Sequence, residues 1–462
     1  MPIAAVIAFA ATIDAKLRFP RLAASLLAAS LMFTVFHAAA WAAQPSAHEH
    51  WVTTWTASPQ PVWGADFAFP TNIPAVVQNQ TFRQVARISL GGRRFRLVLS
   101  NAYGHQPLVI GRVSVALAGA GPAIDLPSLR NVTFGGQTSA MIPAGAPLLS
   151  DPIDLPVLAL SHLSVSIYLP ASTPITTFHW DGRQTAWIAA GDQTAWATID
   201  TKKSITTVIT ARAVLTGIDV QVNHPDARTV AVLGDSITDG NGATVNADAR
   251  WPDFLAQRLV HRHIAVINAG ISGARLLSDK MGANALARFG PDVLDQPGVR
   301  TVIVLLGIND ISWPGTAFDP QGHAPSLQSL EYGFRQLIAQ AHRRNVCLIG
   351  ATLTPFAGAL HNTPLDNYFN TDKEALRQQL NTWIRTSGSF DAVLDFDLWA
   401  RDPKQPTHLA ARIDSGDHLH PGDTGNRLLA ESIPLGLLLH EIDSPQLKSY
   451  EASRFSDSTC AR

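Results

Sequence analysis

One serine in the chain stands where a catalytic nucleophile would be useful. An apolar run at 230–233 stops abruptly at Gly234, Asp235 and Ser236, and polar, glycine-containing sequence follows. This pattern predicts a buried strand that ends in a tight turn and presents Ser236 at the edge of a sheet. Ligands of open α/β sheets bind just beyond the carboxyl ends of strands, although most serines in turns only bond nearby backbone.

A serine hydroxyl becomes a good nucleophile when a histidine, itself oriented by a carboxylate, removes its proton. Asp417 and His420 are three residues apart in a loop before the last predicted helix. Asp417 can therefore accept a hydrogen bond from one ring nitrogen of His420 while the other nitrogen faces Ser236. His418 is the rival base, but its neighbour Asp417 would orient it less easily. Asp235 is predicted to stabilise the turn rather than to serve as the acid.

Acyl transfer also needs hydrogen-bond donors aimed at the developing oxyanion. Glycine-rich and polar clusters follow two further apolar runs, at 268–273 and 307–310. The backbone N–H groups of Ser236 and Gly273 and the side-chain amide of Asn309 are the predicted donors. If the preceding strands are parallel, all of these loops lie on one edge of the sheet, and such convergence indicates a catalytic site.

The acidic and histidine residues before the last predicted helix are also types that bind zinc or calcium; they are Asp414, Asp417, His418 and His420. A metal site would leave the serine and the oxyanion donors unexplained. We therefore expect neither a metal nor a cofactor.

The elements that would position these residues alternate between strand and helix along the second half of the chain. Short apolar runs predict strands at 229–233, 264–268, 301–306, 346–351 and 392–396. Amphipathic segments between and after them predict helices at 251–262, 283–289, 327–344, 372–386 and 422–440. This alternation predicts a parallel, doubly wound α/β sheet with right-handed crossovers.

The stretch at 50–222 has a different pattern, with short alternating segments separated by Gly, Pro and Asn. Regularly spaced alternation of this kind predicts an all-β sandwich or jelly roll. His179 lies in this stretch, away from the strand-end loops, and is interpreted as a structural residue. A short linker at 222–228 joins the two predicted domains, which we place at 50–222 and 229–443.

The N-terminal residues resemble an export signal. Basic residues precede an apolar run at 22–36, and small residues at positions 40 and 42 fit a cleavage site after Ala42. An uncleaved anchor at 22–43 is the alternative. We expect a signal peptide at 1–42, a secreted or periplasmic mature protein without stable membrane insertion, and a polar tail at 444–462.

Composition excludes several classes of partner and site. The net charge is -1, which gives no overall field that would favour nucleic acid or an anionic membrane. The two cysteines, Cys347 and Cys460, are too few for a cysteine-based metal site. Cys347 lies in an apolar run, which favours a buried thiol over a disulfide between the two.

The polar segments at 234–240, 268–273, 307–310 and 417–421 resemble the four sequence blocks of the SGNH hydrolases, also called GDSL esterases and lipases. Ile237 stands where the family name has leucine. The resemblance implies a flavodoxin-like three-layer α/β/α sandwich, a catalytic triad of Ser236, His420 and Asp417, and an oxyanion hole formed by Ser236, Gly273 and Asn309. The β-rich stretch, including the segments at 51–59 and 81–84, is similar to that of secreted esterases associated with xylan degradation.

These observations lead us to expect an exported serine ester hydrolase that removes short acyl groups through an acyl-enzyme. Its substrate would be a small-molecule or polysaccharide ester, with acetyl groups on plant polysaccharide as our first expectation. Three alternatives stay open: an arylesterase or lysophospholipase, a transferase that passes the acyl group to a sugar, and a catalytically silent carbohydrate-binding protein.

Overall fold

The structure is a computed structural model that describes residues 49–200 and 206–439. The predicted signal peptide at 1–42, its cleavage site and the predicted tail at 444–462 lie outside the described residues. The described residues from His50 onward belong to one compact unit. Within it we call the part that runs from 50 to 222 the β-region and the part from 228 to 439 the α/β-region.

A five-stranded parallel sheet forms the centre of the α/β-region. Its strands in chain order are β19 (Arg228–Gly234), β20 (Ile264–Gly270), β21 (Val299–Leu305), β22 (Cys347–Ala351) and β23 (Ala392–Leu394). Across the sheet the order is β20-β19-β21-β22-β23, which is the 2-1-3-4-5 order of flavodoxin-like doubly wound sheets. These strands are almost wholly buried, because helices cover both faces.

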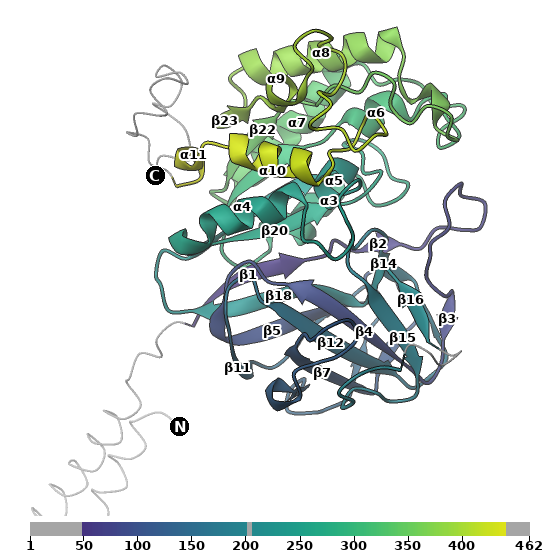
Figure 1. The fold of residues 1–462 in the computed structure, drawn as a ribbon, viewed down its shortest axis with the longest axis vertical. Helices are drawn as coiled ribbons and strands as arrows, with labels where there is room; N and C mark the ends of the chain where they lie inside the picture. Colours follow the sequence, from purple (N-terminus) through teal and green to yellow (C-terminus); the bar gives the residue numbers. More distant parts are fainter. Residues whose placement is uncertain (1–48, 201–205, 440–462) are drawn as a thin grey trace, which may run out of the picture. The chain divides into compact units, whose positions relative to one another are not determined.

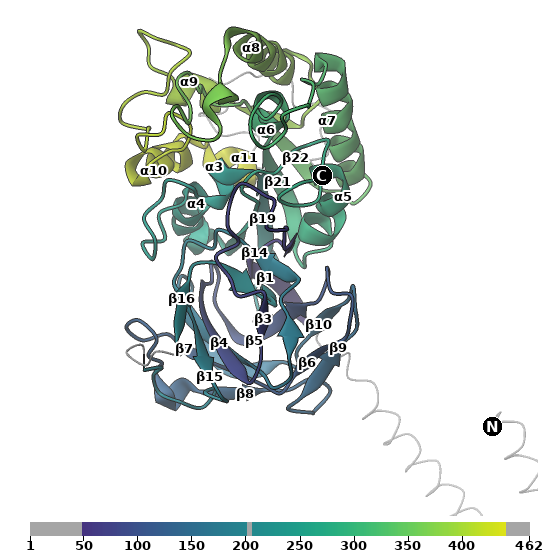
Figure 2. The ribbon, with the colours of Figure 1, turned by 90° about the vertical axis from the view of Figure 1, so that its right-hand side faces the viewer.

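Helices lie on both sides of this sheet (Figure 2). One side carries α4 (Trp251–Leu259), α9 (Phe396–Ala400) and α10 (Asp423–Ser432), and the other carries α5 (Ala285–Phe289) and α7 (Leu327–His342). The remaining helices are α3 (Ser236–Asp239), α6 (Ile308–Ser312), α8 (Thr371–Thr386) and α11 (Leu435–Leu439), with shorter helical turns η2 (Val260–Arg262), η3 (Gly290–Leu294) and η4 (Asp366–Tyr368).

The predicted strands and long helices of this region are all present, with ends shifted by a few residues. The helix predicted at 422–440 was wrong as a single element, since the chain leaves the helical conformation at Ile433 and resumes as α11. Pro434 accounts for the break, because proline disfavours a helical residue before it. The short helices α3, α6 and α9 were not predicted.

The described residues of the β-region form strands and one short turn, η1 (Leu126–Ser128), and the two largest sheets are antiparallel (Figure 1). The first sheet contains β1 (His50–Thr56), β18 (Leu215–Val222), β5 (Gly92–Ser100), β10 (Pro147–Leu149) and β11 (Ile153–Val157). The second contains β16 (Thr207–Ile209), β15 (Ala186–Ala190), β4 (Gln80–Arg87), β12 (His162–Leu169), β7 (Arg112–Leu117) and β8 (Arg130–Val132). Alternate apolar residues of both sheets share one hydrophobic cluster, which is the packing of a sandwich.

Three smaller antiparallel sheets complete the β-region. They pair β13 (Thr173–Pro174) with β3 (Val76–Val77), β6 (Leu108–Ile110) with β9 (Ala140–Ile142), and β14 (Thr177–His179) with both β17 (Arg212–Ala213) and β2 (Gln60–Pro61). The last of these, β17-β14-β2, contacts the loops around the candidate site described below.

Hydrogen bonds join the β-region directly to the parallel sheet. Thr229 Oγ1 donates to the carbonyl oxygen of Thr53 at 2.9 Å, and the backbone N–H of Val266 donates to Ser89 Oγ at 3.0 Å. Thr56 Oγ1 also donates to the carbonyl oxygen of Asn268. Buried hydrogen bonds require a fixed geometry, so the β-region is a structural support for β19 and β20.

The structure also describes one of the two cysteines and the lengths of the helices. Cys347 is buried in β22 and is disulfide-bonded, so the expectation of a free thiol there was wrong. Cys460 lies outside the described residues. Among the residues that the structure describes, every helix is too short or too polar to cross a membrane.

Candidate active site

The candidate nucleophile lies where β19 turns into α3. Asp235 precedes the helix and accepts a hydrogen bond from the backbone N–H of Ile237 at 3.1 Å, so it caps the first turn. Ser236 is the first residue of α3, and only 7% of it is exposed. The turn thus holds the serine hydroxyl at the carboxyl edge of the parallel sheet, as the sequence predicted.

A continuous chain of hydrogen bonds joins the three predicted catalytic residues. His420 Nε2 lies 2.8 Å from Ser236 Oγ, and His420 Nδ1 lies 2.6 Å from Asp417 Oδ2. An ionised Asp417 can only accept a hydrogen bond, so His420 Nδ1 carries a proton. His420 Nε2 is then the nitrogen that can take the proton of Ser236. The arrangement can perform nucleophilic acyl transfer.

Asp417 is kept ionised by the same contacts that orient the histidine. Burial raises its pKa, but hydrogen bonds from the ring and backbone N–H of His420 and from Leu419 lower it well below the ordinary value. A carboxylate in this state stabilises the imidazolium that forms when His420 accepts the serine proton.

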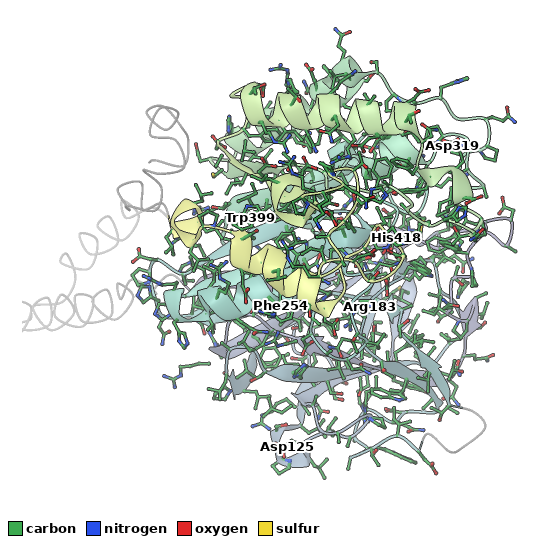
Figure 3. The ribbon with its side chains drawn as sticks, turned by 45° about the horizontal axis from the view of Figure 1, so that its top comes forward. Asp125, Arg183, Phe254, Asp319, Trp399 and His418 are labelled. Carbon is green, nitrogen blue, oxygen red and sulfur yellow. The ribbon has the colours of Figure 1, made fainter. Side chains whose placement is uncertain are left out.

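The rival base His418 points to a different partner. Its Nδ1 atom lies 2.6 Å from Asp414 Oδ2, and 54% of its side chain is exposed. Figure 3 labels His418 on the loop that precedes α10. The alternative metal set is thus divided into two separate pairs, Asp414 with His418 and Asp417 with His420. In the described ranges, no three His, Cys, Asp or Glu side chains are grouped so that they could hold a metal ion.

The predicted oxyanion glycine lies in a crowded turn after β20. Gly273 has a φ of 77°, and a Cβ atom there would lie 2.4 Å from Met281 Sδ and 2.9 Å from Trp313 Cζ2. Any other residue would therefore clash as well as being strained. Within the part of the chain that the structure describes, the N–H groups of Ser236 and Gly273 donate no hydrogen bond, which leaves both available to a ligand.

Asn309 is fixed in a defined orientation. Its Nδ2 atom donates to the carbonyl oxygen of Ala274 at 3.0 Å, and its Oδ1 atom accepts from the hydroxyl of Tyr368 at 2.7 Å. Because a carbonyl oxygen can only accept, the amide nitrogen must be the atom that faces Ala274. One hydrogen of Nδ2 then stays available for an oxyanion.

Tyr368 was not singled out from the sequence. It is fully buried, and burial raises the pKa of Tyr368 well above its usual range, so the hydroxyl keeps its proton and donates to Asn309. Nothing in its local sequence marks it, because the contact joins residues that are 59 positions apart.

The structure also revises our interpretation of His179. Its Nε2 atom lies 2.9 Å from Oδ1 of Asp239, the last residue of α3, and both side chains are buried. His179 is therefore next to the nucleophile turn and not away from it, as its place in the β-rich sequence had indicated. Asp239 was not singled out from the sequence either.

A first prediction concerns Asp235, whose buried Oδ2 atom has no hydrogen-bond partner among the residues that the structure describes. Burial raises the pKa of Asp235 from 3.8 to about 7, so the folded state prefers the neutral carboxyl. The neutral Asp235 carboxyl therefore contributes its full stabilisation of the folded state below pH 3.8, and this stabilisation is lost as the pH rises to about 7. We expect Asp235→Asn to reduce the fall in unfolding free energy between pH 5 and 8 by roughly 3 kcal/mol.

Urea unfolding of wild type and variant at the two pH values measures this difference. Asp154→Asn removes an exposed carboxyl and serves as the control, since 85% of that side chain is accessible. An Asp235→Asn protein with the wild-type pH dependence would contradict the prediction.

A second prediction concerns the orientation of Asn309. Tyr368→Phe removes the hydroxyl that fixes the amide, so kcat for a short p-nitrophenyl ester should fall by about tenfold while KM changes by less than about twofold. Tyr332→Phe, at a residue that is 62% exposed, is the control. Unchanged kcat in Tyr368→Phe would show that the hydroxyl does not position the amide.

Comparison with solved structures finds chains of low identity that cover less than half of this chain. An acetyl xylan esterase shares 20% identity over 44% of this chain and 96% of its own, with a TM-score of 0.33. A carbohydrate acetylesterase from Sinorhizobium meliloti shares 16% over 44% and 95%, with a TM-score of 0.35. The aryl esterase of M. smegmatis shares 19% over 48% and 99%, with a TM-score of 0.36. A search of the curated proteins finds no match.

The family comparison is more specific. The GDSL-like Lipase/Acylhydrolase family matches residues 232–428, which begin within β19 and end within α10. This range contains the turn with Ser236, the loops that carry Gly273 and Asn309, and the Asp417–His420 pair. Residues 232–428 thus resemble the GDSL-like lipase/acylhydrolase family in sequence, and together with the hydrogen-bonded Ser236, His420 and Asp417 this match identifies the protein as a carboxylic ester hydrolase.

Proposed function

We propose that the protein is an exported serine esterase that releases short acyl groups, acetyl above all, from carbohydrate esters. The observation that carries the catalytic part is the hydrogen-bonded chain from Ser236 Oγ through His420 to Asp417, at 2.8 and 2.6 Å. Export to the periplasm or beyond the cell rests on the predicted signal peptide at 1–42.

In this proposal Ser236 attacks the ester carbonyl while His420 Nε2 takes its proton. The N–H groups of Ser236 and Gly273 and the amide of Asn309 stabilise the tetrahedral oxyanion, a contribution of about 3–4 kcal/mol for each donor. His420 then protonates the leaving alcohol, and the acyl-enzyme forms. Water, activated by the same histidine, releases the acid and restores Ser236.

The loop at 271–284, which carries Gly273 and is here called the oxyanion loop, is crowded, and this crowding supports a short acyl group. Met281 and Trp313, which flank Gly273, are 2% and 1% exposed and pack within the core of the α/β-region. A long acyl chain that ran past Gly273 would meet these buried side chains, and displacing them is costly.

A cluster of aromatic side chains supports a carbohydrate as the alcohol part. Phe318 contacts Trp313 on one side and Phe67 and Phe69 of the β-region on the other, at centroid distances of 4.8–4.9 Å. Trp180 stacks on Phe69 in turn. Phe67, Phe69 and Trp180 are partly exposed, and such rings can offer flat apolar faces to a ligand.

The central test is replacement of the nucleophile. We expect Ser236→Ala to lose hydrolysis of p-nitrophenyl acetate by roughly 10⁴-fold or more, and to lose labelling by a fluorophosphonate probe. Ser139→Ala, at an exposed serine of the β-region, should keep its label and serves as the control. Full hydrolysis by Ser236→Ala would refute the assignment, and an unlabelled wild type would favour a silent carbohydrate-binding protein.

Substrate range is tested with a series of p-nitrophenyl esters. Because Met281 and Trp313 leave little room, we expect kcat/KM to fall by at least about tenfold from the acetate to the octanoate. Acetylated xylan, an aryl acetate and a lysophospholipid should be compared in the same assay. Preference for the octanoate or the lysophospholipid would overturn the short-acyl proposal and favour a lipase.

A further inference from the structure

His179 of the β-region faces hydrogen-bond acceptors with both ring nitrogens. Nε2 lies 2.9 Å from Asp239 Oδ1, and Nδ1 lies 2.9 Å from the carbonyl oxygen of Ser58. Since neither a carboxylate nor a carbonyl oxygen can donate, both contacts are satisfied only by the doubly protonated imidazolium. Burial lowers the pKa of His179, but Asp239 and the Ser58 carbonyl raise it above its ordinary value overall.

Asp239 bonds both His179 and the oxyanion loop. Its second oxygen, Oδ2, accepts from both the backbone N–H and the hydroxyl of Ser272, each at 2.8 Å. Ser272 is the residue directly before Gly273. The backbone of Asp239 also lies against Gly270, where a Cβ atom would be 2.5 Å from the Asp239 nitrogen. The carboxylate thus fixes the loop from which the Gly273 N–H projects.

A second contact from the same small sheet reaches the other end of this loop. Gln60 of β2 is fully buried, and its Nε2 atom donates to the carbonyl oxygen of Met281 at 2.6 Å. Its Oε1 atom accepts from the backbone N–H of Trp180, the residue after His179. Met281 is the residue whose sulfur lies against Gly273.

We propose that His179 is a positioning residue of the esterase: as an imidazolium paired with Asp239, it holds Ser272 and thereby the Gly273 N–H where the oxyanion forms. Gln60 supports the same loop from Met281. The β-region is then a working part of the catalytic centre. This inference rests on the proposed roles of Ser236 and Gly273.

Two substitutions of His179 separate its two contacts. The amide nitrogen of Gln can occupy the place of ring Nε2 and donate to Asp239, whereas that of Asn occupies the place of Nδ1 and leaves Asp239 Oδ1 unpaired. We expect His179→Asn to lower kcat for p-nitrophenyl acetate by roughly 10–100-fold with KM changed by less than about twofold, because one oxyanion donor is misplaced. His179→Gln should recover most of this loss.

The matched control is His162→Asn. His162 also joins the β-region to an aspartate of the α/β-region, with Nε2 lying 2.7 Å from Asp248 Oδ2, but it does not touch the oxyanion loop. This variant should keep the wild-type kcat. If His179→Asn does not fold, as judged by circular dichroism, Gln60→Met tests the same loop from Met281 and should also lower kcat at constant KM.

Wild-type kcat in His179→Asn, or equal losses of kcat in the Asn and Gln variants, would overturn the proposal. The rate of fluorophosphonate labelling at Ser236 separates this failure from failure of the proposed function. If the wild type is labelled but hydrolyses no ester in the panel, the substrate class is wrong, and a slower label in His179→Asn than in His179→Gln still supports the positioning role. If the wild type is not labelled, both proposals fall.

Discussion

The site depends on the place of β19 between β20 and β21 in a parallel sheet. Gly234 at the end of β19 lies opposite Gly270 on one side and Leu305 on the other. The three strands therefore end together, and the loops that leave them carry Ser236, Gly273 and Asn309 to one edge. Parallel pairing alone brings the three loops to one edge of the sheet. Side-chain hydrogen bonds add to this by holding the individual residues in position.

Two carboxyl groups near the nucleophile are held in opposite protonation states by their surroundings. Asp417 receives hydrogen bonds from His420 and Leu419, and these lower its pKa and keep it charged beside the histidine. Asp235 receives one backbone hydrogen bond in a fully buried position, and burial raises its pKa to about 7. The residue next to the serine in sequence is thus less suited to be the ionised acid than Asp417, which lies on a distant loop.

The residues proposed for catalysis could be singled out from the sequence because each carries a local signal. Ser236 follows an apolar strand directly, and Asp417 and His420 are close enough in sequence to bond within one loop. The parallel sheet and the all-β region could also be predicted, because the apolar period changes from two to helical spacing near 228. Pro434 was overlooked as a helix break, although proline is a strong local signal.

The supporting residues could not be predicted, since their contacts depend on the tertiary fold. Tyr368 reaches Asn309 across 59 positions, and His179 reaches Asp239 across 60. In the sequence, both look like ordinary buried side chains.

The contact between Gln60 and Met281 spans 221 positions, and it has a consequence for how the enzyme matures. Contacts so distant in sequence form only after long loops have closed, which is entropically costly and slow. Strands and helices of the α/β-region can form from nearer contacts, but the loop that carries Gly273 gains its last restraints when the β-region has folded against it. The restraints on the Gly273 loop would therefore be complete only once both regions have folded and packed together.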